Sequence, residues 1–204
     1  MRYALHAEWT KLRTLASTFW LLVAGTGMIR VTLAATPRRL TVLAAKAAVL
    51  TGLVLVTGTI AILASLLVGG LILPGHGIGP SHGYPALSPG DGPVLRAALG
   101  SVLYLVLVAL LSLGVATAVR EAAASIGVVL GLLYLFPIIG AVAGSPALAR
   151  HIQQIGPMTA GLAIQATTGL SSLPISPWAG LGVLAAWAAG ALTLGGLLLH
   201  LRDA

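Results

Sequence analysis

Four apolar runs, each long enough to cross a lipid bilayer, constrain the fold of this chain more than any other feature. They cover residues 47–73, 94–119, 122–143 and 178–199, and none carries a charge near its middle. A helix that spans the hydrocarbon core needs about 20 consecutive apolar residues. The chain is 58% hydrophobic and 7% charged, whereas a soluble domain is about 25% charged. The sequence therefore predicts an all-α integral membrane protein with about four transmembrane helices in a single membrane domain, residues 1–204.

The connection before the last run contains a shorter apolar stretch, residues 158–170, which follows Gly156 and Pro157. A stretch of about 13 residues is too short to span a bilayer. We expect a short outer helix here, re-entrant or interfacial, with an ordinary loop helix as the alternative. Between the second and third runs only Arg120 and Glu121 interrupt the apolar sequence, which predicts a tight antiparallel hairpin.

The basic residues predict the orientation of the spans. If the N-terminus lies inside, nine of the 11 Lys and Arg residues fall on the inner side. These nine are Arg2, Lys11, Arg13, Arg30, Arg38, Arg39, Lys46, Arg120 and Arg202, and the other two are Arg96 and Arg150. Cytoplasmic segments carry an excess of Lys and Arg, so both termini are expected in the cytoplasm. Charges along the membrane edge also favour membrane lipid over nucleic acid as a partner.

The first 25 residues combine an amphipathic segment with a short apolar one. In residues 2–16 the apolar side chains of Leu5, Trp9, Leu12 and Ala16 recur at helical spacing, which predicts an N-terminal interfacial amphipathic helix. Residues 15–25 would form a helix of about 16 Å, too short for a hydrocarbon core of about 30 Å. A signal peptide is the competing interpretation, but it would require export of the basic segment that follows, against the charge distribution.

A second short helix is expected over residues 28–36, where Pro37 stops it and two arginines follow. A short helix in a basic cytoplasmic connection is a candidate docking element for a soluble partner. A surface helix that rests on lipid explains the same residues equally well. The candidate docking residues are Met28, Ile29, Arg30, Leu33, Arg38 and Arg39.

The sequence contains few of the motifs expected of an enzyme. The only lysines are followed by Leu12 and Ala47, so neither completes the G-x-x-x-x-G-K-[ST] motif that binds ATP phosphates. A metal site built from His76, His82 and Asp91 would lie in a Gly/Pro-rich loop, and a solvated loop is the simpler interpretation. With no cysteine and no Ser/His/Asp set on rigid elements, we expect no catalytic residues, no metal and no cofactor in this chain.

Three segments of the sequence resemble, residue by residue, those of a known family. They are LHAEWTKLRTLAST at 5–18, GTGMIRVTLAATPRR at 25–39 and SPWAGL at 176–181, the last followed at the end of the chain by Arg202, Asp203 and Ala204. Together they resemble permease subunits of the type 2 (exporter) class of ATP-binding-cassette (ABC) transporters, especially the short bacterial ones. The similarity extends over nearly the whole chain.

The resemblance implies a fold and a set of partners. The family has six transmembrane helices preceded by an interfacial elbow helix. Two such subunits pair as a homo- or heterodimer, and two ATPase subunits dock on their cytoplasmic loops. By position, residues 2–16 would be the elbow helix, 28–36 the coupling helix and 158–170 the short outer helix before the last span. The resemblance also implies a location in a bacterial plasma membrane.

The sequence departs from this family in one respect. After residues 17–20 the family has a full membrane helix, an outer loop and a second helix, but here Val23 and Ala24 lead almost directly into the cytoplasmic connection. Two helices are therefore predicted to be missing, an even number that preserves the topology. The first hypothesis is a permease subunit that exports an unknown compound with a separate ATP-binding subunit. The alternative is a truncated permease that serves as a non-transporting interaction or immunity subunit, or a relic.

Overall fold

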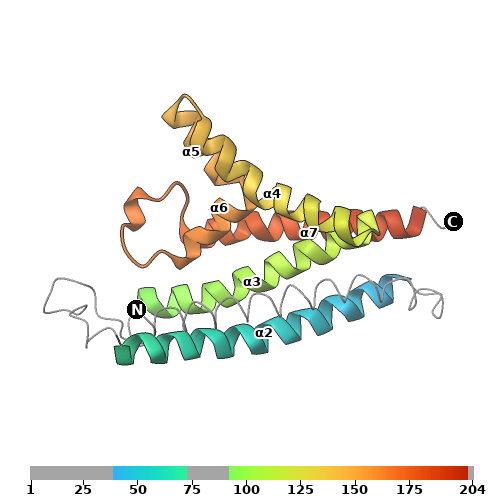
Figure 1. Cartoon of the computed structure of the whole chain (residues 1–204), viewed down its shortest axis with the longest axis horizontal. Coiled ribbons are helices and arrows are strands. Elements are labelled where there is room, and N and C mark those ends of the chain that lie inside the picture. Colours follow the sequence, from blue (N-terminus) through green and yellow to red (C-terminus); the bar gives the residue numbers. More distant parts are fainter. Residues whose placement is uncertain (1–38, 73–91, 202–204) are drawn as a thin grey trace, which may run out of the picture.

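The computed structural model describes residues 39–72 and 92–201, and these residues form helices joined by short turns (Figure 1). The four long helices are α2 (Arg39–Ile72), α3 (Gly92–Val119), α4 (Ala122–Val142) and α7 (Pro177–Leu201). Between α4 and α7 lie α5 (Pro146–Ile155), α6 (Pro157–Leu162) and two 3-10 turns, η3 (Ala163–Gln165) and η4 (Leu170–Ser172). No strand occurs among these residues. The predicted all-α architecture with four candidate membrane spans is confirmed.

Each predicted apolar run corresponds to one long helix, but α2 begins at Arg39 rather than at residue 47. Lys46 marks the limit of the apolar run without interrupting the helix, because straight-chain lysine has good helix propensity. The outer surfaces of the four helices are apolar, with Val49, Val56, Ile60 and Leu67 among the most exposed side chains of α2. Such surfaces suit lipid rather than water.

Helix α3 is the centre of the bundle, with α2 packed on one side and α7 on the other (Figure 1). Half of the most apolar 18-residue stretch of α3 is buried in the bundle, whereas 11% of the corresponding stretches of α2 and α4 is buried. Val54 of α2 packs on Val106 and Ala109 of α3. On the opposite side Leu111 of α3 forms a second cluster with Leu184 and Ala188 of α7.

Glycine lets α3 and α7 approach closely. A Cβ atom at Gly114 would lie 2.5 Å from the carbonyl carbon of Ala191, and one at Gly195 would lie 2.7 Å from the carbonyl oxygen of Gly114. Thr117 is buried beside this contact, and its hydroxyl donates to the Leu113 carbonyl at 2.7 Å. Close backbone contact replaces the hydrophobic effect as the source of helix association in lipid.

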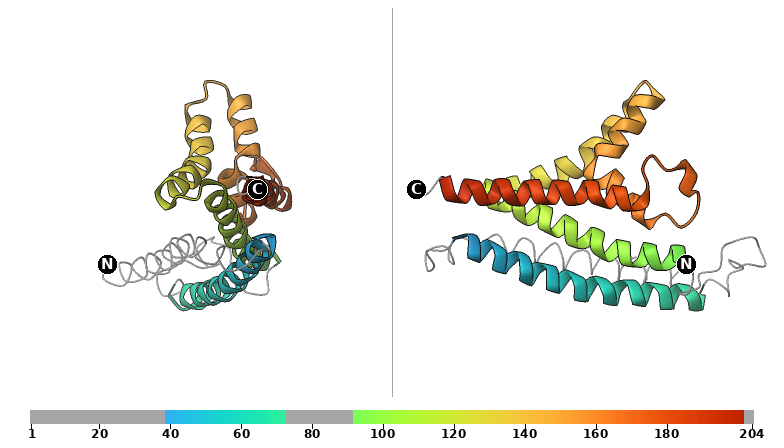
Figure 2. Two further views of the ribbon diagram at one scale, coloured as in Figure 1. Left: turned by 90° about the vertical axis from the view of Figure 1, so that its right-hand side faces the viewer. Right: turned by 180° about the vertical axis from the view of Figure 1, so that it is seen from behind.

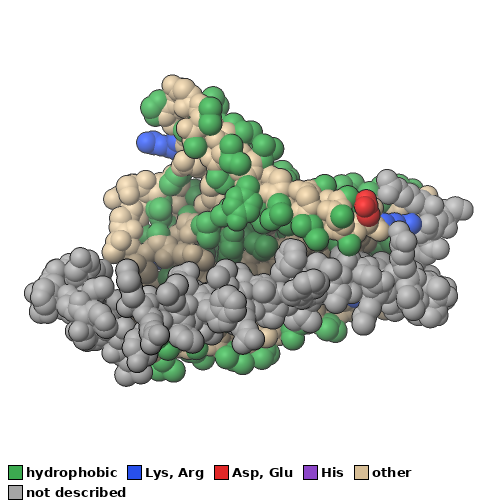
Figure 3. Space-filling model, viewed as in Figure 1, with side chains coloured by type: hydrophobic (Ala, Val, Ile, Leu, Met, Phe, Trp, Pro, Cys, Tyr) green, Lys and Arg blue, Asp and Glu red, His purple; other side chains and the backbone are tan. Residues whose placement is uncertain are grey.

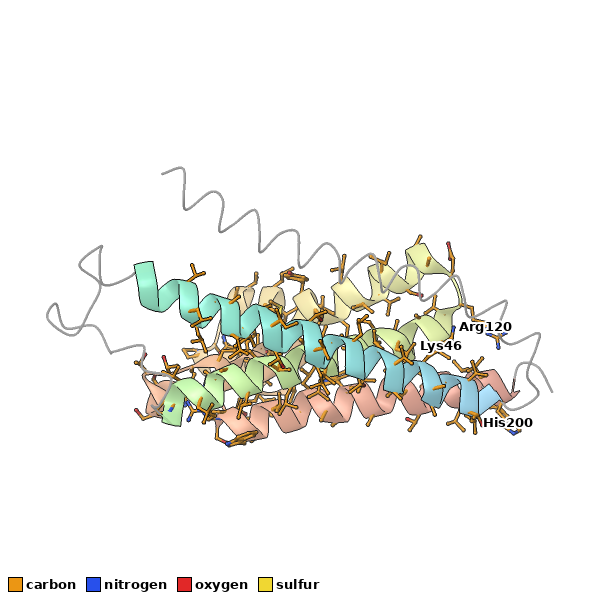
Figure 4. The ribbon with its side chains drawn as sticks, turned by 90° about the horizontal axis from the view of Figure 1, so that it is seen from below. Lys46, Arg120 and His200 are labelled. Carbon is orange, nitrogen blue, oxygen red and sulfur yellow. The ribbon has the colours of Figure 1, made fainter. Side chains whose placement is uncertain are left out.

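The charged residues of the described spans lie toward helix ends. We call one end of the bundle the basic end: α2 and α4 begin there, α3 and α7 end there, and Lys46, Arg120 and His200 lie toward it (Figure 4). Arg120 joins α3 to α4 in a left-handed conformation with φ of 61°. The chain reverses direction at this residue, where the short interruption between two apolar runs predicted a hairpin.

The α3–α7 contact predicts that the same substitution destabilises the protein at one glycine of α7 more than at another. Gly195→Ala should lower the free energy of unfolding by about 1–3 kcal/mol, because the added methyl overlaps backbone. Gly190→Ala is the matched control, since a Cβ atom there meets nothing within 4 Å. Thermal unfolding in detergent measures both. Equal melting temperatures for the two variants would contradict the close packing.

Candidate functional site

The most distinctive feature of the fold is the re-entrant segment, residues 146–165, which comprises α5, α6 and η3. Helix α5 packs against α4, and α6 contacts both α4 and α7, so that it lies between them. Figure 2 shows the α4–α5 hairpin standing away from the layer formed by α2, α3 and α7. Within the range expected for a short helix before the last span, residues 158–170, the structure has most of α6 and η3, and α5 precedes them across a corner.

Helix α5 was not predicted from the sequence, and the single helix expected over 158–170 ends earlier. Residues 146–155 are of mixed composition, with Arg150, His151, Gln153 and Gln154 among apolar side chains, and no element was predicted for them. The local signals were nevertheless present: the Ser145 hydroxyl accepts from the Leu148 N–H at 3.4 Å, Pro146 occupies the first turn, and Gly156 ends the helix. One face is apolar and the other polar, as expected for a helix at a lipid boundary.

The corner between α5 and α6 lies at Gly156 and Pro157, where one backbone hydrogen bond of the helix is lost and a side-chain hydrogen bond replaces it. Pro157 has no N–H and cannot donate to the carbonyl of Gln153, four residues earlier. The Thr159 hydroxyl donates to that oxygen instead, at 2.8 Å. The Gly156 N–H still donates to Ile152 at 3.0 Å. Polar backbone in lipid must be satisfied within the protein, and these bonds do so.

Trp187 of α7 completes the corner. Its indole N–H donates to the Ile155 carbonyl at 2.9 Å. Trp187 lies ten residues after Pro177, the first residue of α7, which is about 15 Å along the helix axis. This is half of a hydrocarbon core of about 30 Å. The corner therefore packs against the first half of α7, inside the bundle rather than beyond the end of the helix.

Aromatic packing extends this contact to α4. The rings of Phe136 and Trp187 meet edge to face, with centroids 5.9 Å apart. A Cβ atom at Gly156 would lie 2.7 Å from the Cβ atom of Phe136, so only glycine fits at the corner. Phe136 immediately precedes Pro137 inside α4. One aromatic pair thus joins α4, α7 and the corner of the re-entrant segment.

The other side of the re-entrant segment is clamped against α3 and α7. A side chain at Gly180 would overlap the Ala160 carbonyl, and one at Gly100 would overlap Ile164. Ile164 and Ala160 are completely buried. Because a single methyl group at either glycine would collide with the segment, α6 and η3 are fixed by close packing rather than resting on the bundle.

Two polar side chains bond the connections that follow the segment, at the end of the bundle opposite the basic end. Arg96 of α3 donates from Nη2 to the Ala166 carbonyl at 2.6 Å. Gln154 of α5 donates to the Pro174 carbonyl at 2.7 Å. Both acceptors lie in non-helical connections, so these bonds supply the partners that a regular helix would otherwise provide.

The described residues contain no group of three metal-ligating side chains. His151 and Arg150 are exposed on α5, and apolar side chains cover much of the visible described surface (Figure 3). The described residues form an apolar bundle in which the corner between α5 and α6 has its Gln153 and Ile155 carbonyls hydrogen-bonded by Thr159 and Trp187.

The residues predicted for docking lie almost entirely outside the described part of the chain. Met28, Ile29, Arg30, Leu33 and Arg38 precede it, as do the expected elbow helix at 2–16, the coupling helix at 28–36 and the short apolar stretch at 15–25. Arg39 is the first residue of α2. The alternative metal residues His76, His82 and Asp91 also lie outside the described residues.

Sequence analysis did not identify the residues that build the re-entrant corner, which include Trp187, Thr159 and Phe136. A tryptophan ten residues into an apolar span is unusual because tryptophan prefers membrane interfaces, and this was the available signal.

Comparison with known protein families, curated proteins and solved structures gives no match to this chain.

The corner predicts a specific role for the Trp187 indole N–H. Trp187→Phe keeps an aromatic ring against Phe136 but leaves the Ile155 carbonyl without its donor. The free energy of unfolding should fall by about 0.6–2 kcal/mol, the range for hydrogen bonds in membrane proteins. Thermal unfolding in detergent measures it. Trp178→Phe is the control, because Trp178 is 59% exposed at the start of α7. A smaller loss at Trp187 than at Trp178 would refute the role of the bond.

Proposed function

We propose that this chain is the membrane-spanning permease subunit of an ABC exporter and works with a separate ATP-binding subunit. The observation that supports the proposal most directly is the re-entrant segment immediately before α7. The family that the sequence resembles has a short outer helix at this position. The three segments of similar sequence, at 5–18, 25–39 and 176–181, support the same assignment.

The charge distribution supports an apolar or amphiphilic cargo. Across the described spans the only Lys or Arg residues within the helices are Arg39 and Lys46 near one end of α2 and Arg96 near the start of α3. Ion-driven transport normally needs ionisable groups inside the membrane. A subunit without them at the centre of its described spans is better suited to transport driven by a partner's ATP hydrolysis.

Helix α2 supplies a route for that coupling. It begins at Arg39, directly after the proposed docking segment 28–38, and continues for 34 residues, which is about 50 Å of unbroken helix. A displacement at its basic end would therefore be carried through the membrane as a rigid-body motion. The apolar cluster in which Val54 and Leu50 of α2 pack on Val106 of α3 would transmit this motion to α3.

A second candidate is a non-transporting interaction or immunity subunit. It is favoured by the four candidate spans in the described part of the chain, because the resembled family has six and residues 15–25 are too short to add one. Sealed vesicles that contain only this chain and one ATPase distinguish the two candidates. Substrate-dependent export supports the permease, and association with the ATPase without export supports the interaction subunit.

The orientation in the proposal can be tested with two cysteines, since the chain has none of its own. Ser171 in η4 and Ala123 in α4 are exposed near opposite ends of the bundle (Figure 1). In intact cells an impermeant thiol reagent should label Ser171→Cys and leave Ala123→Cys protected until the cells are opened. The reverse pattern would place the basic end outside and remove the docking proposal.

The docking proposal predicts that Arg30→Glu reduces co-purification of the ATPase severalfold, because it reverses one charge of the basic segment 28–39. Membrane insertion should be unchanged. Arg150→Glu, at the exposed polar face of α5, is the control with the same charge change. If co-purification survives both Arg30→Glu and deletion of residues 28–36, the ATPase docks elsewhere.

A further inference from the structure

Two helix breaks caused by proline lie side by side in the fold. Pro137 lies inside α4 and has no N–H to donate to the carbonyl of Leu133, four residues earlier. Pro157 removes a donor in the same way at the corner between α5 and α6. A Cβ atom at Gly156 would lie 2.7 Å from the Cβ atom of Phe136, so the two breaks are in contact. Because sharp helix bends occur at proline, both arms of the α4–α5 hairpin have a weak point at the same level.

The part of the chain between the two breaks packs chiefly on itself. We call residues 138–155 the flap, which consists of the end of α4, a short turn and α5. Of these residues, all of which the structure describes, Gly140 alone is buried. The atoms nearest to a Cβ at Gly140 belong to Ile152, Gln153 and Ala149 of α5. The two arms of the flap therefore hold each other and would move as one body.

The residues beyond both breaks are fixed to the bundle. On the α4 side, Leu132 and Leu133 pack on the buried cluster that α3 forms with α7. On the other side of the corner, α6 and η3 are clamped against α3 and α7, where Ala160 and Ile164 are fully buried. Hinges are short segments that absorb a change in backbone angles between rigid parts, and the paired breaks have this position.

The side-chain hydrogen bonds between the flap and other described residues all lie near the corner. Those donated by Thr159 and Trp187 end on backbone carbonyls directly beside it, where a rotation would move the acceptors least. The remaining bond runs from Nε2 of Gln154 to the Pro174 carbonyl at 2.7 Å. It joins α5 to the connection before α7, so it is the bond that a rotation of the flap would break.

A small rotation at the paired breaks would displace the tip of the flap substantially. Helix α5 has 10 residues and is about 15 Å long. A bend of about 20°, the lower end of sharp helix kinks, would displace the end of α5 at Pro146 by about 5 Å. None of residues 143–150, all of which are described, is buried. The displacement would therefore expose no core.

We propose that residues 138–155 rotate as one body about a hinge at Pro137 and the Gly156–Pro157 corner, and that the Gln154–Pro174 hydrogen bond is the latch of this flap. The latched position is the one in the structure. Opening parts α5 from the connection that precedes α7, on the side where the α4–α5 hairpin stands away from the other helices (Figure 2). This inference concerns the folded membrane chain and does not depend on the proposed export activity.

Pairs of spin labels can measure the rotation, because the chain has no cysteine of its own. One pair crosses the hinge, from Ala147→Cys on α5 to Leu194→Cys on α7. The reference pair joins Leu95→Cys on α3 to the same position on α7, and all three side chains are exposed. In the purified full chain in lipid nanodiscs, double electron–electron resonance should give the pair across the hinge a second distance component, displaced by up to about 5 Å. The reference pair should show a single component.

The latch and the hinge have separate variants. Gln154→Ala removes the donor and should raise the ratio of displaced to latched flap about fivefold, which corresponds to roughly 1 kcal/mol for one hydrogen bond. Gln165→Ala is the matched control, because Gln165 is an exposed glutamine of η3, and it should leave the ratio unchanged. Pro137→Ala restores an N–H within α4 and should diminish the displaced component.

A single component for the pair across the hinge, as narrow as that of the reference pair, would overturn the proposal. This comparison keeps the wild-type hinge and latch, so it decides the matter even if one of the variants fails to fold. A displaced component that Gln154→Ala leaves unchanged would show that the bond to Pro174 is not a latch. One that Pro137→Ala leaves unchanged would place the hinge elsewhere, and either result also overturns the proposal.

Discussion

The hydrocarbon core has no water to bond backbone N–H and C=O groups, and the rest of this structure depends on that constraint. It makes the four long helices the natural form of the apolar runs, because each helix pairs its own backbone. It also explains the bonds at the re-entrant corner. There Pro157 removes one donor, Thr159 replaces it, and Trp187 bonds the Ile155 carbonyl. A break between two helices in apolar surroundings is sustained only with such replacements.

Close packing decides how the helices assemble once their backbones are paired. Lipid tails are as apolar as the side chains, so association depends on contact area and short backbone distances. The α3–α7 contact has glycine on both sides, at Gly114 and Gly195, and α3 is the most buried helix. Helix α4 has a largely lipid-facing surface and is joined to α7 through α6 and the Phe136–Trp187 pair. In the proposed permease α4 would therefore be held by fewer packing contacts than α3, beside the re-entrant segment.

The charged residues of the described spans lie toward the ends of the helices. The basic end holds Lys46 and Arg120, and Arg39 there leads from the proposed docking segment into α2. Arg96 near the opposite end is used structurally, to bond the Ala166 carbonyl. A membrane subunit of the proposed kind would couple to a soluble ATPase at this end of α2.

The sequence by itself determined the number and type of the spans, because length and hydropathy are local properties that suffice to place a helix in lipid. It also determined the hairpin at Arg120 and the presence of a short helix before α7. It did not reveal α5, nor the roles of Trp187 and Phe136. Only the tertiary structure decided that α3 is central and that the corner packs against α7, because four similarly apolar helices differ in where small residues permit backbone contact. That depends on which helix faces meet, and such pairings between distant residues are not encoded in any single segment.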